Sequence, residues 1–218
     1  MSAIAIINSN SFKKYLNYRC NHFEVAQFPL RTQNKKVLDS IGDNALMLKV
    51  KAGELDHLGL LYERYKRPLF GYFYHMNSDK MLAEDLVQAV FLRVIKYKHS
   101  FRGDGQFKTW VFHVARNVNA DHHKKNKNYT SDIEDEHHDL VEEETGIHTK
   151  EDQLSQMERA LTMLDEDKRE LLTLSKLKNM KYREIGELYD CTESAIKVKV
   201  FRAMQALKKQ FEALEMMG

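Results

Sequence analysis

FRGDGQFKTWVFHVARNVNADHHKK, residues 101–125, is the most informative stretch of this sequence. A glycine-containing turn with an aromatic residue and an arginine leads into a segment with helical apolar spacing and a basic end. Single-stranded nucleic acid binds surfaces of this kind, because cations contact its phosphates and aromatic faces stack on its bases. An amphipathic helix with Trp110 in a core and a solvated basic end has the same pattern. This stretch alone is therefore consistent with either interpretation.

The composition is typical of a helical protein without a membrane span. The 218-residue chain has only two prolines and nine glycines, and 43% of its residues are hydrophobic. No apolar run approaches the roughly 18 residues of a membrane-spanning helix, and the N-terminus lacks the basic segment of a signal peptide. Cys20 and Cys191 have no CxxC partner, which indicates free thiols in a reducing compartment. We therefore expect a cytoplasmic protein.

Charge is distributed unevenly along the chain. Residues 1–129 carry 21 Lys and Arg against 11 Asp and Glu, whereas residues 130–152 carry one Lys against ten acids. A segment that is this acidic and has few apolar residues cannot bury enough surface to fold alone. We therefore expect residues 126–152 to be a flexible linker. It contains His137 and His138, but metal ligands need a scaffold that fixes them. We predict no metal site here and no cofactor.

Helical periodicity extends on both sides of the opening stretch. Apolar residues at three-to-four spacing predict a helix from Asp43 to Pro68, followed by helices over 67–76, 83–97 and 107–123. The polar run at 77–79 is typical of a helix cap. The predicted fold class is all-α, with one small helical domain over 41–125 and another over 153–218. The first 40 residues form an extension of unclear role.

The second domain ends in a helix-turn-helix pattern. A short amphipathic segment, 182–189, is followed by a turn and by the longer segment 194–211, which has five cations and no acid. Such a pair is typical of DNA-binding proteins, in which the second helix enters the major groove. The alternative is a hairpin packed for stability, with a solvated basic face. We expect these residues to cap that second helix or to face DNA: Thr192, Ser194, Lys197, Val198, Lys199 and Arg202.

Together, three segments resemble the extracytoplasmic-function (ECF) class of the bacterial sigma-70 family. AEDLVQAVFLRV, residues 83–94, is similar to the helix with which this family binds core RNA polymerase. FRGDGQFKTWVFHVARN, residues 101–117, is similar to its promoter-melting loop and −10-reading helix. YREIGELYDCTESAIKVKVFRA, residues 182–203, matches its −35-reading helix-turn-helix. The first domain and the second therefore each carry a motif of the family, in the order that the family has.

The resemblance implies partners and contact residues. Core RNA polymerase would bind through its beta-prime clamp and beta flap, and an anti-sigma factor would hold the protein inactive. Implied polymerase contacts are Asp85, Leu86, Val87, Gln88 and Phe91. Implied −10 DNA contacts are Phe101, Arg102, Gly103, Arg116, Asn117 and Lys124, and the helix-turn-helix residues above would bind the −35 element. The protein would not be an enzyme, since the polymerase supplies the chemistry.

Three positions depart from the family pattern. Ala89 stands where the family often has an acid, Asp165 where region four usually has a proline, and Lys199 where arginine is more typical. The resemblance also implies that the linker threads toward the RNA exit path. Alternatively, the linker is only a solubilising tether between the two domains. A response regulator would need alternating strands and helices in its first domain, but residues 43–125 show only helical periodicity.

Overall fold

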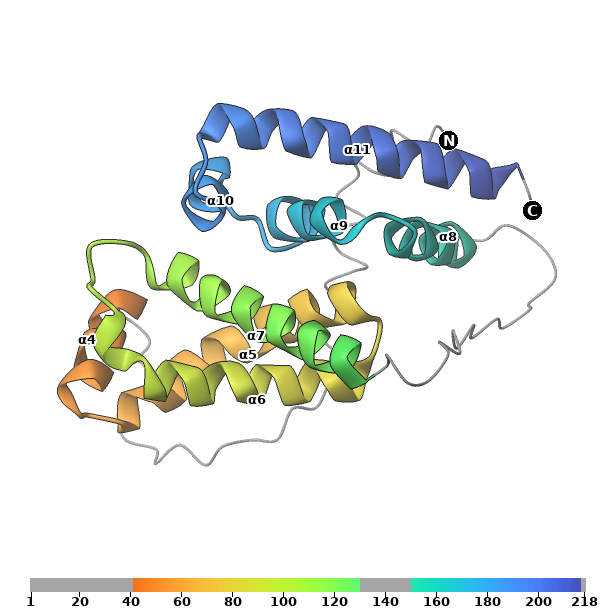
Figure 1. Ribbon diagram of the computed structural model, residues 1–218. Helices are drawn as coiled ribbons and strands as arrows, with labels where there is room; N and C mark the ends of the chain where they lie inside the picture. Colours follow the sequence, from red (N-terminus) through yellow and green to blue (C-terminus); the bar gives the residue numbers. More distant parts are fainter. Residues whose placement is uncertain (1–40, 130–149, 217–218) are drawn as a thin grey trace.

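The computed structural model describes residues 41–129 and 150–216, and there the chain forms helices in two layers (Figure 1). The first layer contains α4 (Asp43–Ala52), α5 (Asp56–Asn77), α6 (Lys80–Lys96), the short 3-10 turn η1 (Lys98–Ser100) and α7 (Phe107–Tyr129). The second contains α8 (Lys150–Thr162), α9 (Glu166–Leu172), the π-helical turn η3 (Thr173–Leu177), α10 (Tyr182–Tyr189) and α11 (Glu193–Glu215). The predicted all-α fold class is confirmed. The predicted N-terminal extension and most of the predicted linker lie outside the described residues.

The first layer is built around α5, which packs against α4, α6 and α7. Tyr72 and Phe73 of α5 are fully buried, and the Tyr72 ring lies edge-on to Phe112 of α7 at 5.7 Å. The predicted cap before α6 is confirmed: the Asp79 side chain accepts a hydrogen bond from the Leu82 backbone N–H at 3.1 Å. This cap satisfies one of the free N–H groups at the start of the helix.

The expectation that the first helix ends at Pro68 is wrong. The break falls at Gly53, whose φ of 109° is readily adopted only by glycine and which ends α4. α5 then continues through Pro68 to Asn77. Proline removes the bond that the Arg64 carbonyl would accept, but buried residues on both sides, including Leu61 and Leu69, hold the helix in the core. Tertiary packing overrides the local preference here.

In the second layer, α11 lies across α8, α9 and α10 (Figure 1). The stripe predicted to face inward is buried throughout, and it consists of Ile196, Val200, Ala203, Leu207 and Phe211. Asp165, which stands where a proline was expected, caps α9 by accepting from the Lys168 backbone N–H at 2.9 Å. This helix therefore begins with an aspartate cap, a common N-cap residue, in place of the proline.

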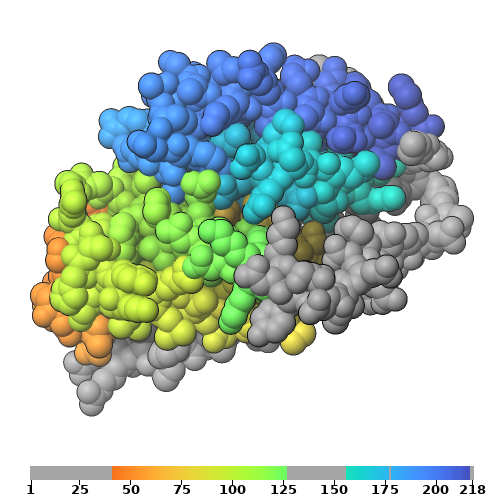
Figure 2. All heavy atoms as spheres, in the orientation of Figure 1, coloured from red at the N-terminus to blue at the C-terminus, as the bar shows by residue number. Residues whose placement is uncertain are grey.

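The two layers are in contact, with α9 and α10 of the second lying on α5 and α7 of the first. Figure 2 shows the atoms of the second layer directly on the green atoms of α7. In the described parts of the chain, no helix is both long enough and apolar enough to cross a membrane.

Candidate nucleic-acid interface

The aromatic residues of the opening stretch form part of the core of the first layer. Phe101 is only 2% exposed, and its ring lies edge-on to Trp110 at 5.5 Å and to Phe107 at 6.0 Å. Trp110 is half-buried against the same cluster. Of the two interpretations of this stretch, the core interpretation holds for its aromatic residues. Phe101 was expected to contact DNA, but in this structure its ring is not accessible to a base.

The loop between Phe101 and α7 is tied to α4 at both ends. The Asn44 side chain donates to the Gly105 carbonyl and accepts from the Phe107 backbone N–H, both at 2.7 Å. Lys51 Nζ donates to the Phe101 carbonyl at 2.7 Å. Gly103 has a φ of 85°, and a Cβ there would lie 3.3 Å from the Leu48 side chain. Any other residue at this position would strain the backbone and crowd Leu48, so glycine makes this turn at the lowest cost in free energy.

Beyond this loop, α7 presents three different faces. Its inner face is apolar and buried, with Val111, Phe112 and Val118 in the core. A second face is exposed and carries Asn117 and Lys124 among the predicted DNA contacts; Arg102 in the preceding loop is exposed as well. Asn117 Nδ2 lies 3.3 Å from His113 Nδ1 one turn earlier. The third face carries Arg116 and lies against the second layer.

α10 and α11 form the predicted helix-turn-helix, and its turn is tight. Gly186 lies where a Cβ would come within 2.6 Å of the Cys191 carbonyl oxygen, so only glycine fits without a backbone shift. The Cys191 N–H donates to the Gly186 carbonyl at 2.9 Å. The Thr192 hydroxyl accepts from the Ala195 N–H at 3.2 Å, so its predicted cap is confirmed. These contacts fix the direction in which α11 leaves the turn.

The outward face of α11 is exposed along its first half, where Lys197 pairs with Glu193 at 2.9 Å and Lys199 Nζ lies 5.7 Å from the centre of the Tyr189 ring. All six residues predicted to face DNA are exposed: Thr192, Ser194, Lys197, Val198, Lys199 and Arg202. One residue of this face was missed: Phe201 is 63% exposed beside Arg202. It lies off the buried stripe, and projecting the helix at 100° per residue would have found it. An exposed apolar ring among cations can contact the methyl group of thymine in a major groove.

Comparison with known proteins agrees with this geometry. A model of sigma-70 region 2 matches residues 61–129, and a model of sigma-70 region 4 matches residues 154–207. The ECF RNA polymerase sigma factor SigM of Bacillus subtilis is 30% identical over 149 residues, which cover 68% of this chain and 91% of SigM. The chain belongs to the ECF sigma factors. The ECF RNA polymerase sigma-E factor of Escherichia coli is 27% identical over 201 residues, covering 81% of this chain and 97% of that protein.

Two solved structures also resemble this ECF sigma factor. CnrH, solved in complex with the cytosolic domain of CnrY, has a TM-score of 0.61 at 19% identity and shares the fold, with 78% of this chain and 97% of CnrH covered. The sigma factor RpoE from Bartonella quintana, solved with the anti-sigma factor NepR, has a TM-score of 0.56 at 25% identity. In that case 75% of this chain and 98% of RpoE are covered.

In this ECF sigma factor, the five predicted polymerase contacts on α6 divide into two groups. Asp85 and Gln88 are exposed on the outer face of the helix. Leu86, Val87 and Phe91 are each at most 6% exposed and pack into the region 2 core, so their side chains are not on that surface. The exposed face also carries two apolar residues that the sequence prediction missed, Met81 and Leu92. Both are one helical turn from a predicted contact, at i−4 from Asp85 and i+4 from Gln88.

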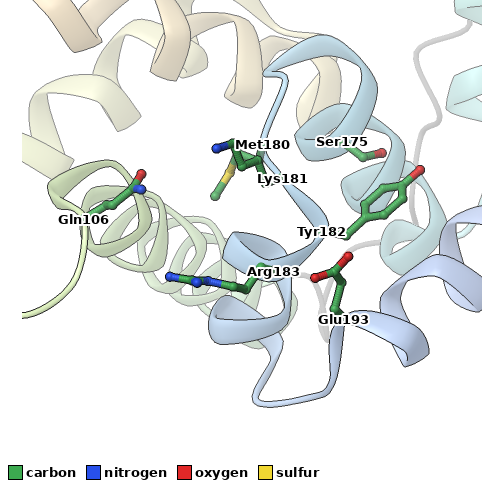
Figure 3. Close-up of a pocket in the computed structure, with 7 residues that line it drawn as sticks. All are labelled: Gln106, Ser175, Met180, Lys181, Tyr182, Arg183 and Glu193. Carbon is green, nitrogen blue, oxygen red and sulfur yellow. The ribbon is translucent and has the colours of Figure 1, made fainter.

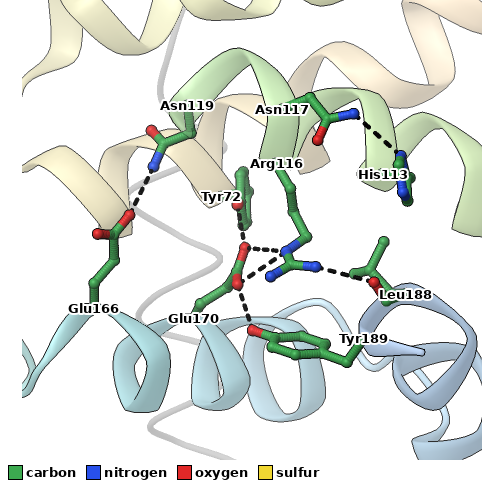
Figure 4. A network of polar contacts seen from close by, with 9 residues as sticks. All are labelled: Tyr72, His113, Arg116, Asn117, Asn119, Glu166, Glu170, Leu188 and Tyr189. Atoms are coloured by element: carbon green, nitrogen blue, oxygen red, sulfur yellow. Dashed lines mark hydrogen bonds and ion pairs between the residues drawn. The ribbon is translucent and has the colours of Figure 1, made fainter. Parts of the chain in front are cut away.

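Arg116, expected to hold a DNA phosphate, instead joins a polar network between regions 2 and 4 (Figure 4). Its Nε lies 3.0 Å from both carboxylate oxygens of Glu170 in α9, and its Nη1 donates to the Leu188 carbonyl of α10 at 3.0 Å. Its guanidinium carbon lies 4.0 Å from the centre of the Tyr189 ring, a cation–π contact. The prediction for Arg116 missed this because its partners are more than 50 residues away in sequence.

Glu170 is the centre of this network. It is 6% exposed, and besides Arg116 it accepts hydrogen bonds from the hydroxyls of Tyr72 and Tyr189. Burial raises the pKa of both tyrosines, and the nearby Glu170 carboxylate raises it further. Burial works to lower the pKa of Arg116, but Glu170 together with the neighbouring Tyr189 and Tyr72 outweighs it, and the net shift is upward. The network therefore holds one cation, one anion and two neutral hydroxyl donors.

An open cleft lies beside this interface, with a volume of about 610 Å³ (Figure 3). Gln106 contributes from the position just before α7, and the other lining residues come from region 4: Ser175, Met180, Lys181, Tyr182, Arg183 and Glu193. Within residues 41–129 and 150–216, no cluster of His, Cys, Asp and Glu has the composition of a metal site. His137 and His138 lie outside these residues.

Proposed function

We propose that this ECF sigma factor binds core RNA polymerase, recognises −35 and −10 promoter elements, and melts the −10 DNA. The observation that carries the proposal is the exposed cationic face of α11, which is set at a fixed angle by the tight turn at Gly186. A helix with this exposure fits the major groove of B-DNA. The polymerase would supply the chemistry, and this chain would act as a binding factor rather than as an enzyme.

For the −35 element, we assign base reading to Arg202, Val198 and Phe201, which share the centre of the exposed face of α11. An arginine can donate two hydrogen bonds to guanine, and apolar side chains contact the thymine methyl group. Lys197 and Lys199 flank them, and Ser194 lies one turn before Val198 on the same face. All three can contact phosphates, whose contacts set register and affinity rather than sequence choice. Thr192 serves the same helix as its cap.

For the −10 element, we assign DNA contact to Arg102, Asn117 and Lys124, which are exposed, and to the backbone around Gly103. Phe101 then has a different role: it holds the loop in place through the core. The Nε and Nη1 atoms of Arg116 are available to DNA only after their bonds to region 4 are broken. Unstacking a base costs a few kcal/mol, so such contacts must compensate for strand opening.

For core polymerase, we propose that the exposed face of α6 docks on the beta-prime clamp through Asp85 and Gln88, flanked by Met81 and Leu92. Leu86, Val87 and Phe91 support this face from beneath, and region 4 would reach the beta flap. We also propose an anti-sigma partner, because RpoE of Bartonella quintana was solved with the anti-sigma factor NepR. The acidic segment would lead toward the RNA exit path.

Run-off transcription with purified bacterial core polymerase and a library of promoter fragments tests the proposal. We expect defined transcripts that depend on this chain, and co-elution of the chain with core. The double variant Asp85→Ala/Gln88→Ala should lose core binding while its melting temperature stays unchanged, since both side chains are exposed. The absence of both core binding and initiation with the wild-type chain would contradict the proposed function.

A further inference from the structure

The polar network between the two regions engages the guanidinium group of Arg116, which DNA binding would also use. Arg116 directs Nε to Glu170 and Nη1 to the Leu188 carbonyl, and its side chain is 28% exposed. A carboxylate and a phosphate both present charged oxygen acceptors to a guanidinium group. A promoter phosphate would therefore have to displace Glu170 to bind the same nitrogen atoms.

Further contacts hold the same face of α7 against region 4. Lys108, two turns before Arg116, lies 3.9 Å from the Glu184 carboxylate and donates to the Lys178 carbonyl at 3.4 Å. Asn119, almost one turn after Arg116, donates to Glu166 at 3.4 Å. Region 4 thus covers this face over about three turns. DNA can approach only the other exposed face while these contacts persist.

We propose that Glu170 is an intramolecular competitor for promoter phosphate, which closes region 4 onto the −10-reading helix of the free protein. The identity of the displaced ligand rests on the proposed function, whereas the closure concerns the free chain alone. Asp85 and Gln88 lie on α6, outside this network. Polymerase can therefore engage region 2 in the closed form, and DNA then takes the place of Glu170 on Arg116.

The chemistry of the network suits a contact that can open. It is polar, and each of its donors can be satisfied by water or phosphate once the regions separate. Removing the charge of Glu170 takes away the ionic part of the contact and leaves a side chain of the same shape. Arg116 would then be a half-buried charge without its ion-pair partner, so it would favour the open form, in which water or DNA solvates it.

The test compares Glu170→Gln with the wild-type full-length chain. We expect a larger radius of gyration by small-angle X-ray scattering and faster hydrogen exchange along residues 107–119. A fluorescent single-stranded oligonucleotide of random sequence should bind up to about tenfold more tightly. This factor applies if about nine-tenths of the wild-type protein is closed, so that only about one-tenth can bind. The salt dependence of log K should steepen by about 0.7, for one added phosphate contact.

Glu166→Gln is the matched control, because Glu166 lies one turn earlier on α9, outside the Arg116 network, and a glutamine there keeps an acceptor oxygen for Asn119. It should leave all three measurements near wild type. Tyr72→Phe removes the hydroxyl with which region 2 donates to Glu170 and keeps the buried ring, so it should open the protein partly even where Glu170→Gln folds poorly. A folded Glu170→Gln chain with wild-type dimensions overturns the closure, and opening without tighter DNA binding overturns the competition. Neither result depends on transcription by the wild-type chain, which judges the proposed function separately.

Discussion

α7 and α11 were both predicted to contact DNA from the same kind of evidence, an apolar stripe with cations beside it, yet the structure treats them differently. α11 packs one stripe on region 4 and leaves all its predicted contacts exposed. α7 has a core on one side and region 4 on another, so Arg116 is occupied and only part of the helix faces solvent. A stripe therefore predicts exposure well for a helix with one neighbouring layer and poorly for a helix between two.

The largest expected effect concerns Phe101, where the comparison assigns packing rather than DNA contact. Phe101→Ala should lower the free energy of unfolding by about 3–5 kcal/mol, because it removes a buried ring from the cluster with Phe107 and Trp110. Urea denaturation of the free protein measures this. Arg102→Ala, at the next residue and exposed, should leave stability unchanged and weaken single-stranded DNA binding. If Phe101→Ala has near-wild-type stability, the packing role is wrong and the prediction that Phe101 contacts DNA is favoured again.

The next effect concerns the angle at which α11 is presented. Gly186→Ala puts a Cβ into the Cys191 carbonyl, and such overpacking typically costs about 1–3 kcal/mol. We expect a lower melting temperature together with weaker binding to duplex DNA. Gly105→Ala is the control, since a Cβ at Gly105 meets no atom within 4 Å. Equal effects of the two substitutions would show that the turn at Gly186 is not specially constrained.

Arg202→Ala separates recognition from packing on α11. Arg202 is exposed, so thermal stability should stay within about 0.5 kcal/mol of wild type. Affinity for a promoter selected by this sigma factor should fall by about 1–3 kcal/mol, with relaxed preference at one base pair. Phe201→Ala should relax preference at a thymine instead. A large drop in melting temperature for Arg202→Ala would support the alternative of a hairpin packed for stability.

The smallest effect is a dependence of stability on pH that arises in region 2. Burial lowers the pKa of His75 to about 3, with a smaller contribution from Lys178, and its Nε2 has no hydrogen-bond partner among the described residues. The unfolded chain therefore takes up this proton first, near pH 6.5, so stability should fall by about 1 kcal/mol per pH unit below that value. Thermal melts between pH 7.5 and 5 measure this.

His75→Leu provides the comparison for the pH experiment. It removes the proton uptake and should flatten the profile, whereas His99→Leu, at an exposed histidine, should leave the slope in place. A slope that persists unchanged in His75→Leu would assign the pH dependence to other groups.

Local features of the fold were predictable from sequence, and contacts between distant segments were not. The Asp79 and Thr192 caps and the stripe from Ile196 to Phe211 depend on neighbours within a turn or two, and all three were predicted. Pro68 was misjudged because packing on both sides of it outweighs its local preference. Glu170 gave no signal at all: its partners Tyr72 and Arg116 are 98 and 54 residues away, and no spacing rule connects them.

The hydrogen bonds from Asn44 and Lys51 to the loop before α7 have a thermodynamic consequence for DNA capture. Fixing the backbone of one residue costs about 1–2 kcal/mol of conformational entropy, and here that cost is met when region 2 folds. A melted strand would therefore meet a loop that is already in place, and binding loses little affinity to ordering it. Two residues that lie 61 and 50 positions upstream of their partners in the loop would thus help to set how tightly the DNA is held.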